Sequence, residues 1–449
     1  MHRLKIFAGI LMLALVAPIG AEAQADFTRY VALGDSLTAG FSSGALVRTF
    51  QVNSYPALIN RQATGNAGAF VQPLVSEPGI GGTPGAGILE LRSLIPSPVI
   101  APRPGQGTLT NPLITRPYNN LGVPGARVRD TLGTTSGGLH DLVLQQFSPV
   151  LAGRNALQQM AQLQPTFVTL WIGNNDALAA ATSGRVIEDV TLTSVARFET
   201  EYRAVAAAVA ATGAEFAVAN IPSVTSIPFV TTLPRTFTAN GQQIPLNGPN
   251  GPLGAGDFVL LTATAELSVG GGRPGLAPLS DGVVLSASEV ATINARVSEY
   301  NRIIRTVAQE RGAAFVDANA VLTEASTRGI SVGGLTFSSG FLTGGIFSYD
   351  GVHPNAFGYA YIANRFIQAI NDQFDEDIPP VNLFPFIFGG ATGTSVASSA
   401  LTQPATSFAQ PFVFSREAKN SLLKSLGVPQ WVIDGDQKPP TRKPRRPRG

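Results

Sequence analysis

Short apolar segments alternate with longer helix-like segments along most of this 449-residue chain. The apolar segments predict strands, and the clearest of them is the run at 166–172. Their residues do not alternate between polar and apolar, which indicates strands that are buried on both faces. The expected strands span residues 28–33, 116–121, 166–172, 214–220 and 313–317, and the expected helices span 54–63, 141–163, 194–212 and 287–311. This order favours a parallel sheet covered by helices on both faces.

The composition indicates a sizeable core with long, weakly charged loops. Hydrophobic residues make up 44% of the chain and charged residues only 13%, whereas there are 48 glycines and 33 prolines. There is no cysteine, which excludes disulfides, thiol catalysis and thiolate metal sites.

Residues 1–24 have the features of a secretory signal peptide. A basic start at Arg3 and Lys5 precedes an apolar run from Ile6 to Ile19, and the segment ends in Ala21-Glu22-Ala23. We therefore expect a mature protein that begins near Gln24 and is secreted or periplasmic. No later stretch is long and apolar enough to span a bilayer, so no transmembrane segment is expected.

The rest of the chain divides into one main domain and a C-terminal segment. The domain is expected over residues 25–377, with long insertions at about 65–115 and 222–285 that are rich in glycine and proline. Residues 378–449 are expected to be irregular, ending in a disordered basic tail from about 437. We interpret the tail as solvated rather than as a contact with nucleic acid, and we expect no nucleic-acid partner.

The tetrapeptide Gly34-Asp35-Ser36-Leu37 follows the first expected strand directly. A serine at a strand-to-helix turn can present its hydroxyl and its backbone N–H to a ligand. Ser36 is therefore a candidate nucleophile. The alternative is a turn serine that caps the following helix.

Two further clusters could bind an oxyanion. In Asn120-Leu121-Gly122-Val123-Pro124-Gly125, the glycine at 122 leaves its backbone N–H unobstructed. In Gly173-Asn174-Asn175-Asp176, an asparagine supplies an uncharged NH₂ donor. The alternative for each cluster is an ordinary polar turn.

A histidine base would have to be His140 or His353, the only histidines after the leader. Asp350 lies three residues before His353, and Pro354 marks the start of an expected helix. Asp350 can accept from one ring nitrogen and leave the other as a base. His140 is interpreted as a residue without a chemical role.

Together these blocks resemble the GDSL or SGNH hydrolase family. The resemblance rests on Ser36 in Gly-Asp-Ser-Leu, Gly122 in Asn-x-Gly-x-x-Gly, Asn175 in Gly-x-Asn-Asp, and Asp350-x-x-His353, in that order. It implies a flavodoxin-like three-layer α/β/α sandwich with a five-stranded parallel sheet, here carrying long loop insertions. It also implies Ser36 as nucleophile, His353 as base and Asp350 as orienting acid. Ser36, Gly122 and Asn175 would form the oxyanion hole, with Asn175 rather than Asn174 as the side-chain donor.

The expected activity is that of a secreted serine esterase or lipase that needs no cofactor and no metal and acts on a small-molecule or lipid ester. Alternatives on the same fold are a carbohydrate O-acetyl esterase, a lysophospholipase and a non-catalytic relative that binds a glycan or a lipid. The sequence does not predict the oligomeric state.

Two further motifs compete with this interpretation, but their sequence context does not favour them. Ser331 lies in a Gly-x-Ser-x-Gly pattern, but no clear strand and helix flank it, as a nucleophile elbow requires. Asp372, Asp375, Glu376 and Asp377 could hold a hard cation, but a solvated helix end is the preferred interpretation.

Overall fold

The computed structural model describes residues 25–93, 99–112, 115–134, 136–388, 413–436 and 439. The leader expected at residues 1–24 lies outside these ranges, and so does the basic tail expected from about 437, apart from Pro439. Export of the protein therefore stays a prediction.

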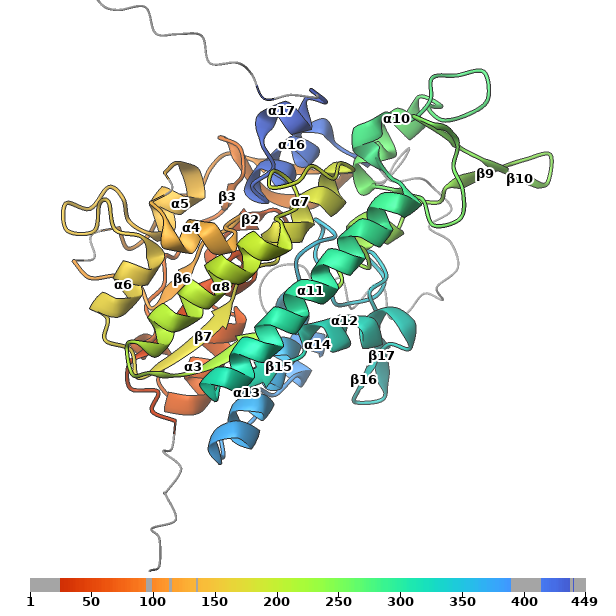
Figure 1. Ribbon diagram of the computed structural model, residues 1–449. Coiled ribbons are helices and arrows are strands. Elements are labelled where there is room, and N and C mark those ends of the chain that lie inside the picture. The colour runs from red at the N-terminus through yellow and green to blue at the C-terminus, as the bar shows by residue number, and fades with distance from the viewer. Residues whose placement is uncertain are drawn as a thin grey trace, which may run out of the picture.

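A five-stranded parallel sheet forms the centre of the fold (Figure 1). In spatial order its strands are β15 (Ala314–Val316), β8 (Glu215–Ala219), β7 (Phe167–Trp171), β1 (Tyr30–Gly34) and β6 (Asn120–Gly122). Each strand overlaps a range expected from the sequence, and β7 and β1 are buried along their whole length. The predicted α/β fold class is confirmed.

Helices cover both faces of this sheet, among them α3 (Tyr55–Thr64), α8 (Val195–Ala210), α11 (Ala287–Arg311) and α13 (Ala356–Phe374). On one face, Val31 and Leu33 of β1 belong to the same buried cluster as α8 and α11, which lie side by side (Figure 1). On the other face, Tyr30 and Ala32 pack in a cluster with α3 and α13. Because successive strand residues point to opposite faces, β1 serves both cores, and its sequence shows no polar alternation.

Helix boundaries follow the sequence signals at one place and depart from them at another. The helix α11 begins after Ser286 with a capping box to Glu289 and ends at Gly312 in a left-handed conformation, as its pattern predicts. The single helix expected at 141–163 is wrong. The structure has α5 (Gly138–Val143) and α6 (Ala156–Gln162) instead, because Pro149 and Gly153 lie in the stretch between them.

The remaining secondary structure consists of short elements. Near the sheet these are α1 (Ser36–Ala39), β2 (Ala45–Leu46), α2 (Arg48–Gln51), α4 (Val128–Leu132), α7 (Asn175–Ser183), α9 (Pro228–Thr231), α12 (Ala318–Thr327), β16 (Ile330–Val332), β17 (Leu335–Phe337) and α14 (Phe384–Phe388). In the insertions they are η1 (Ala67–Ala69), β3 (Ile80–Gly81), β4 (Ala86–Ser93), β5 (Val99–Pro104), β9 (Thr236–Ala239), β10 (Gln242–Pro245), β11 (Asn247–Gly248), β12 (Gly251–Pro252), β13 (Phe258–Val259), η2 (Leu261–Ala263), α10 (Thr264–Ser268), η3 (Asp281–Val283) and β14 (Val284–Leu285).

The C-terminal segment is more ordered than the expected irregular chain from 378 onward. It forms β18 (Val413–Phe414), α16 (Arg416–Ser425) and α17 (Gln430–Ile433), and β18 pairs in parallel with β5 of the first insertion. Figure 1 shows α16 next to α7, with α17 packed against α16. The helix forms because Ser415 caps it and because the apolar side chains of α16 fall on one face, which enters the main core. The expectation of an irregular segment is therefore wrong for residues 413–436.

Candidate active site

The site lies at the edge of the sheet where the parallel strands end. Ser36 follows β1, the turn at 122–126 follows β6, and Asn174 and Asn175 follow β7. Because parallel strands share one carboxyl edge, these three loops meet there. The loop that carries Asp350 and His353 precedes α13 and adds the remaining side chains.

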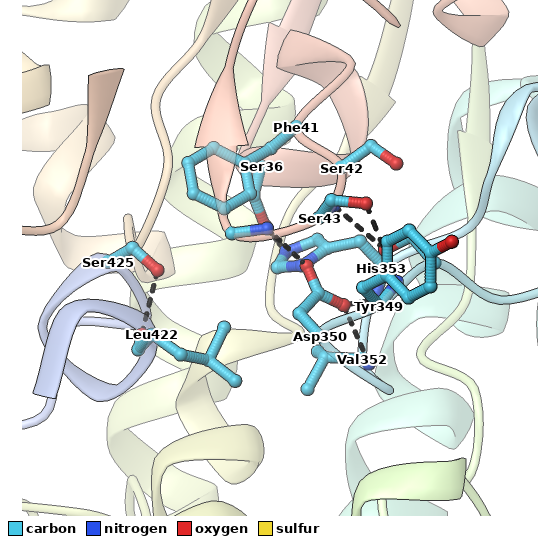
Figure 2. A network of polar contacts seen from close by, with 12 residues as sticks. Ser36, Phe41, Ser42, Ser43, Tyr349, Asp350, Val352, His353, Leu422 and Ser425 are labelled. Carbon is cyan, nitrogen blue, oxygen red and sulfur yellow. Dashed lines mark hydrogen bonds and ion pairs between the residues drawn. The ribbon is translucent and has the colours of Figure 1, made fainter. Parts of the chain in front are cut away.

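Ser36, His353 and Asp350 form one chain of hydrogen bonds (Figure 2). The Ser36 Oγ lies 2.9 Å from Nε2 of His353, and Nδ1 of His353 lies 2.9 Å from Oδ2 of Asp350. All three side chains are buried, with Ser36 the most exposed at 3%. These distances are those of a serine in contact with a base that a carboxylate orients.

Each carboxylate oxygen of Asp350 accepts two hydrogen bonds, one of which comes from Nδ1 of His353. Its Oδ2 accepts from the backbone N–H of Gly44 at 2.8 Å, and its Oδ1 accepts from the N–H groups of Val352 and His353 at 2.9 and 2.8 Å. Burial raises the pKa of this carboxyl, but the charge of His353 and the hydrogen bonds outweigh burial and hold the pKa below its usual value. Asp350 is therefore ionised and fixed in one orientation.

The predicted backbone donor Gly122 is already occupied in this structure. Its N–H donates to Oδ1 of Asn120 at 3.0 Å. A Cβ at this position would lie 2.4 Å from the backbone nitrogen of Ala39, so the glycine is needed for the close approach of α1 to β6. In this structure the N–H of Gly122 therefore has a partner, and the glycine allows α1 to pack against β6; its role as an oxyanion donor stays a prediction.

Gly125, three residues further along the same motif, has the free N–H that Gly122 lacks. Val123 accepts from the N–H of Ala126 at 3.0 Å, which closes a turn with Gly125 at φ +81°. Within the described residues, the N–H of Gly125 has no hydrogen-bond acceptor. The motif Asn-x-Gly-x-x-Gly contains both glycines, so the signal was present, but only the turn geometry tells them apart.

The two asparagines after β7 hold different partners. Nδ2 of Asn174 donates to Oδ2 of Asp35 at 2.8 Å, and Nδ2 of Asn175 donates to the carbonyl of Ala126 at 2.9 Å. Each NH₂ group therefore keeps a second N–H for another acceptor. Asn175 is bonded to the residue after Gly125, so its second N–H belongs to the same part of the site as the Gly125 N–H.

The sequence reasoning missed two buried carboxyls near the asparagines: Asp35, which accepts from Asn174, and Asp176, which follows Asn175 in sequence. Burial raises the pKa of Asp35 to about 6, against the opposing effect of its hydrogen bonds from Asn174 and Leu37. Burial likewise raises the pKa of Asp176 to about 6, although Thr193 and the N–H of Val128 donate to it. Both residues are visible in the motifs Gly-Asp-Ser-Leu and Gly-x-Asn-Asp, where the sequence argument gave them no role.

The C-terminal segment borders the turn of Gly125. A Cβ on Gly125 would lie 2.7 Å from the carbonyl oxygen of Ser425 and 3.0 Å from the nitrogen of Gly427. Figure 2 shows Ser425 and Leu422 of α16 in the same view as the Ser36–His353 pair. A segment almost 400 residues from Ser36 in sequence (36 to 425) thus forms part of the surroundings of the site.

The other residues considered from the sequence lie elsewhere. His140 is buried in α5, burial is the main cause that lowers its pKa, and within the described residues its ring nitrogens have no hydrogen-bond partner. Ser331 is exposed in the middle of the short strand β16, which pairs with β17, so it does not occupy a strand-to-helix elbow.

In the described ranges, Asp372, Asp375, Glu376 and Asp377 do not form a metal-binding group, and no other set of three or more His, Asp or Glu side chains does so. None of the helices that the structure describes is long and apolar enough to cross a membrane.

The model of the GDSL-like lipase/acylhydrolase family matches residues 30–366, which contain the sheet and every residue of the Ser36–His353–Asp350 chain. The chain belongs to this family. No match was found among curated proteins. The C-terminal segment with α16 lies beyond the family match, whereas Gly125 and both asparagines lie within it.

Several solved structures are similar to this protein. A variant of an acetyl-xylooligosaccharide esterase from Geobacillus stearothermophilus is 13% identical with a TM-score of 0.34, covering 76% of this chain and 93% of its own. A phospholipase A1 from Streptomyces albidoflavus is 17% identical with a TM-score of 0.30, covering 77% and 98%. An extracellular lipase from Streptomyces rimosus is 17% identical with a TM-score of 0.31, also covering 77% and 98%. These TM-scores are low, so the assignment rests on the family model.

Proposed function

We propose that this protein is a serine carboxylester hydrolase that works through an acyl-enzyme. The observation that carries the proposal is the unbroken chain from Ser36 Oγ through His353 to Asp350, with 2.9 Å at each step. Its residues match the motifs of a family of lipases and acylhydrolases. A purely binding protein has no need of a buried serine, histidine and carboxylate in this order.

The geometry supports a defined sequence of proton transfers. Ser36 Oγ attacks the ester carbonyl while Nε2 of His353 takes the hydroxyl proton, and Asp350 holds the Nδ1–H. When the tetrahedral intermediate collapses, the C–O bond to the alcohol breaks and His353 returns the proton to the leaving oxygen. Water then gives a proton to His353 and attacks the acyl-Ser36 ester; the C–O bond to Ser36 breaks, the acid leaves, and His353 returns the proton to Ser36 Oγ.

The negative charge on the carbonyl oxygen needs donors at the other side of Ser36. We assign this role to the N–H of Ser36, the N–H of Gly125 and the second N–H of Asn175. The first residue of a helix has an N–H without an intrahelical acceptor, and Ser36 is the first residue of α1. Gly125 replaces Gly122 in this set because only its N–H is free.

A serine-directed phosphonate tests this function directly. The mature protein should be labelled at Ser36 and should hydrolyse p-nitrophenyl esters, and Ser36→Ala should lose both properties while it keeps its thermal transition. A folded wild-type protein that is neither labelled nor active would identify a non-catalytic relative instead.

We also propose that the protein is exported. The proposal rests on the basic, apolar and small-residue regions of residues 1–24. N-terminal sequencing of protein from the periplasm or the culture medium should give a start near Gln24. A full-length chain that keeps Met1 and stays in the cytoplasm would contradict it.

A further inference from the structure

An apolar cavity of about 100 Å³ lies beside the Ser36–His353 pair, on the side of α12, β16 and α13. Its outer walls come from Val321 and Ala325 of α12, Ile330 of β16 and Phe357 of α13. None of the described residues that line it carries a charge. The cavity is thus suited to an uncharged, apolar ligand.

The inner wall of this cavity includes three residues that are adjacent in sequence to Ser36 or His353. Leu37 follows Ser36, and Val352 and Pro354 flank His353. These residues connect the cavity to the Ser36–His353 pair, although neither Ser36 nor His353 lines it.

The few polar groups in the walls are already used by other protein atoms. The indole N–H of Trp171 donates to the carbonyl of Asn220 at 3.1 Å, and the hydroxyl of Tyr361 accepts from Arg365 at 2.6 Å. A ligand with hydroxyl groups would find few hydrogen-bond partners here and would lose its hydration, which costs free energy. An alkyl chain has no such cost.

We propose that this cavity holds the acyl chain of the ester, so that the preferred substrates carry medium-length alkyl acyl groups rather than acetyl groups. This rests on the proposed function, because it needs Ser36 to be acylated. A water-sized group takes roughly 10–15 Å³ of such a cavity, so the cavity has room for about seven to ten of them. An acyl chain of roughly six to ten carbons fits this space.

The first experiment uses the wild-type mature protein and no variant. Ser36 is labelled with methyl and octyl p-nitrophenyl phosphonates, and hydrolysis of p-nitrophenyl acetate and octanoate is measured as kcat/KM. We expect octanoate and the octyl phosphonate to react at least about tenfold faster than their short counterparts, since each buried methylene adds to binding. Equal or faster reaction of the short compounds would overturn the inference.

The second experiment fills the cavity. Ala325→Leu places added carbon atoms at the wall of α12, and Ala320→Leu is its matched control, since Ala320 lies on the exposed face of the same helix. We expect kcat/KM for octanoate to fall about ten- to hundredfold in the Ala325→Leu variant, with acetate nearly unchanged. The control should keep the wild-type ratio, and equal changes in both variants would overturn the inference.

A widening variant covers the case in which Ala325→Leu does not fold. Ile330→Ala removes carbon from the far wall and should move the preferred chain from octanoate toward longer acyl groups. An unchanged chain-length profile in folded Ile330→Ala would count against the inference. If Ser36 is labelled and acetate is hydrolysed, but no chain length is preferred, only the inference about the acyl cavity is wrong. If Ser36 is not labelled at all, the proposed function is wrong as well.

Discussion

The two sides of Ser36 are built in different ways. On the side of His353 and Asp350, which we call the proton-transfer side, the carboxylate has four N–H partners, and the histidine is fixed between it and the serine. On the side of the Gly125 turn and the two asparagines, which we call the oxyanion side, donors and buried amide oxygens without described partners remain. The first side is complete without a ligand, whereas in the mechanism that we propose the second is completed by the charge that forms on the substrate oxygen.

The pKa values of the buried carboxyls on the two sides are also shifted in opposite directions. On the proton-transfer side, hydrogen bonds and His353 lower the pKa of Asp350. On the oxyanion side, burial raises the pKa of Asp35 and Asp176 to about 6 each. Burial alone therefore does not decide the charge of a carboxyl, because the number and charge of its donors can reverse the effect of burial.

The largest effect should come from breaking the proton-transfer side. His353→Ala removes the base, and kcat/KM should fall by about 10⁴-fold or more, as for a member of a catalytic triad. His140→Ala is the control, because His140 has no contact with Ser36 or Asp350 among its described interactions. Kinetics with p-nitrophenyl butyrate measure both, and greater damage from the His140 change would reverse the assignment of the base.

On the oxyanion side a single donor should matter less. Asn175→Ala should lower kcat by about 10²- to 10³-fold, the usual loss for one oxyanion donor. Asn174→Ala should lower kcat less, because Nδ2 of Asn174 donates to Asp35 and not to the carbonyl of Ala126. Near-wild-type kcat in folded Asn175→Ala would remove it from the mechanism, and a larger loss in Asn174→Ala would exchange the two roles.

The raised pKa of Asp176 should make the stability of the protein depend on pH. Folded Asp176, with its pKa raised from 3.8 to about 6, keeps a proton that the unfolded chain releases. Its contribution to stability is present below the unfolded pKa and is lost as pH rises through the folded pKa, so the free energy of unfolding falls over this range. Between about pH 4 and pH 7, the free energy of unfolding of Asp176→Asn should therefore rise relative to that of the wild type by up to about 3 kcal/mol.

Urea unfolding at several pH values measures this gain. Asp372→Asn, at an exposed position on α13, serves as the matched control. Asp350 has the opposite sign, since its pKa is lowered, and its contribution is lost as the pH falls below the usual aspartate value. A difference between Asp176→Asn and wild type that does not change with pH would mean that Asp176 stays ionised in the folded protein.

The smallest expected effect concerns the C-terminal segment. A Cβ on Gly427 would lie 2.8 Å from the carbonyl oxygen of Gly125, so Gly427→Ala should displace the oxyanion turn. We expect kcat to fall about tenfold with KM little changed, because small displacements of a donor are costly. Gly435→Ala is the matched control: Gly435 has a similar positive φ (85° against 74°), but no atom lies within 4 Å of its Cβ position. Equal losses in both variants would make the effect one of backbone strain.

Much of the fold could be predicted, because the pattern of apolar residues along the sequence indicates which segments are buried. The strands are apolar runs buried on both faces, and α11 carries its own start and stop signals at Ser286 and Gly312. The helix expected at 141–163 failed because an apolar pattern continued past Pro149 and Gly153. The C-terminal helix α16 was missed because its apolar face is short and lies between a low-complexity stretch and a basic tail.

The sequence by itself determined which chemical groups could meet, because the order of strands and motifs brings Ser36, Asn175, Asp350 and His353 to one edge of a parallel sheet. Only the tertiary structure decided which neighbours are free to act. The sequence pattern points to Gly122, but in the structure the Gly122 N–H donates to the Asn120 side chain, whereas the Gly125 N–H, in the turn closed at Val123, has no acceptor among the described residues. The reason is physical: a motif specifies donors and acceptors, but their availability depends on partners that may lie hundreds of residues away, as Ser425 does from Gly125.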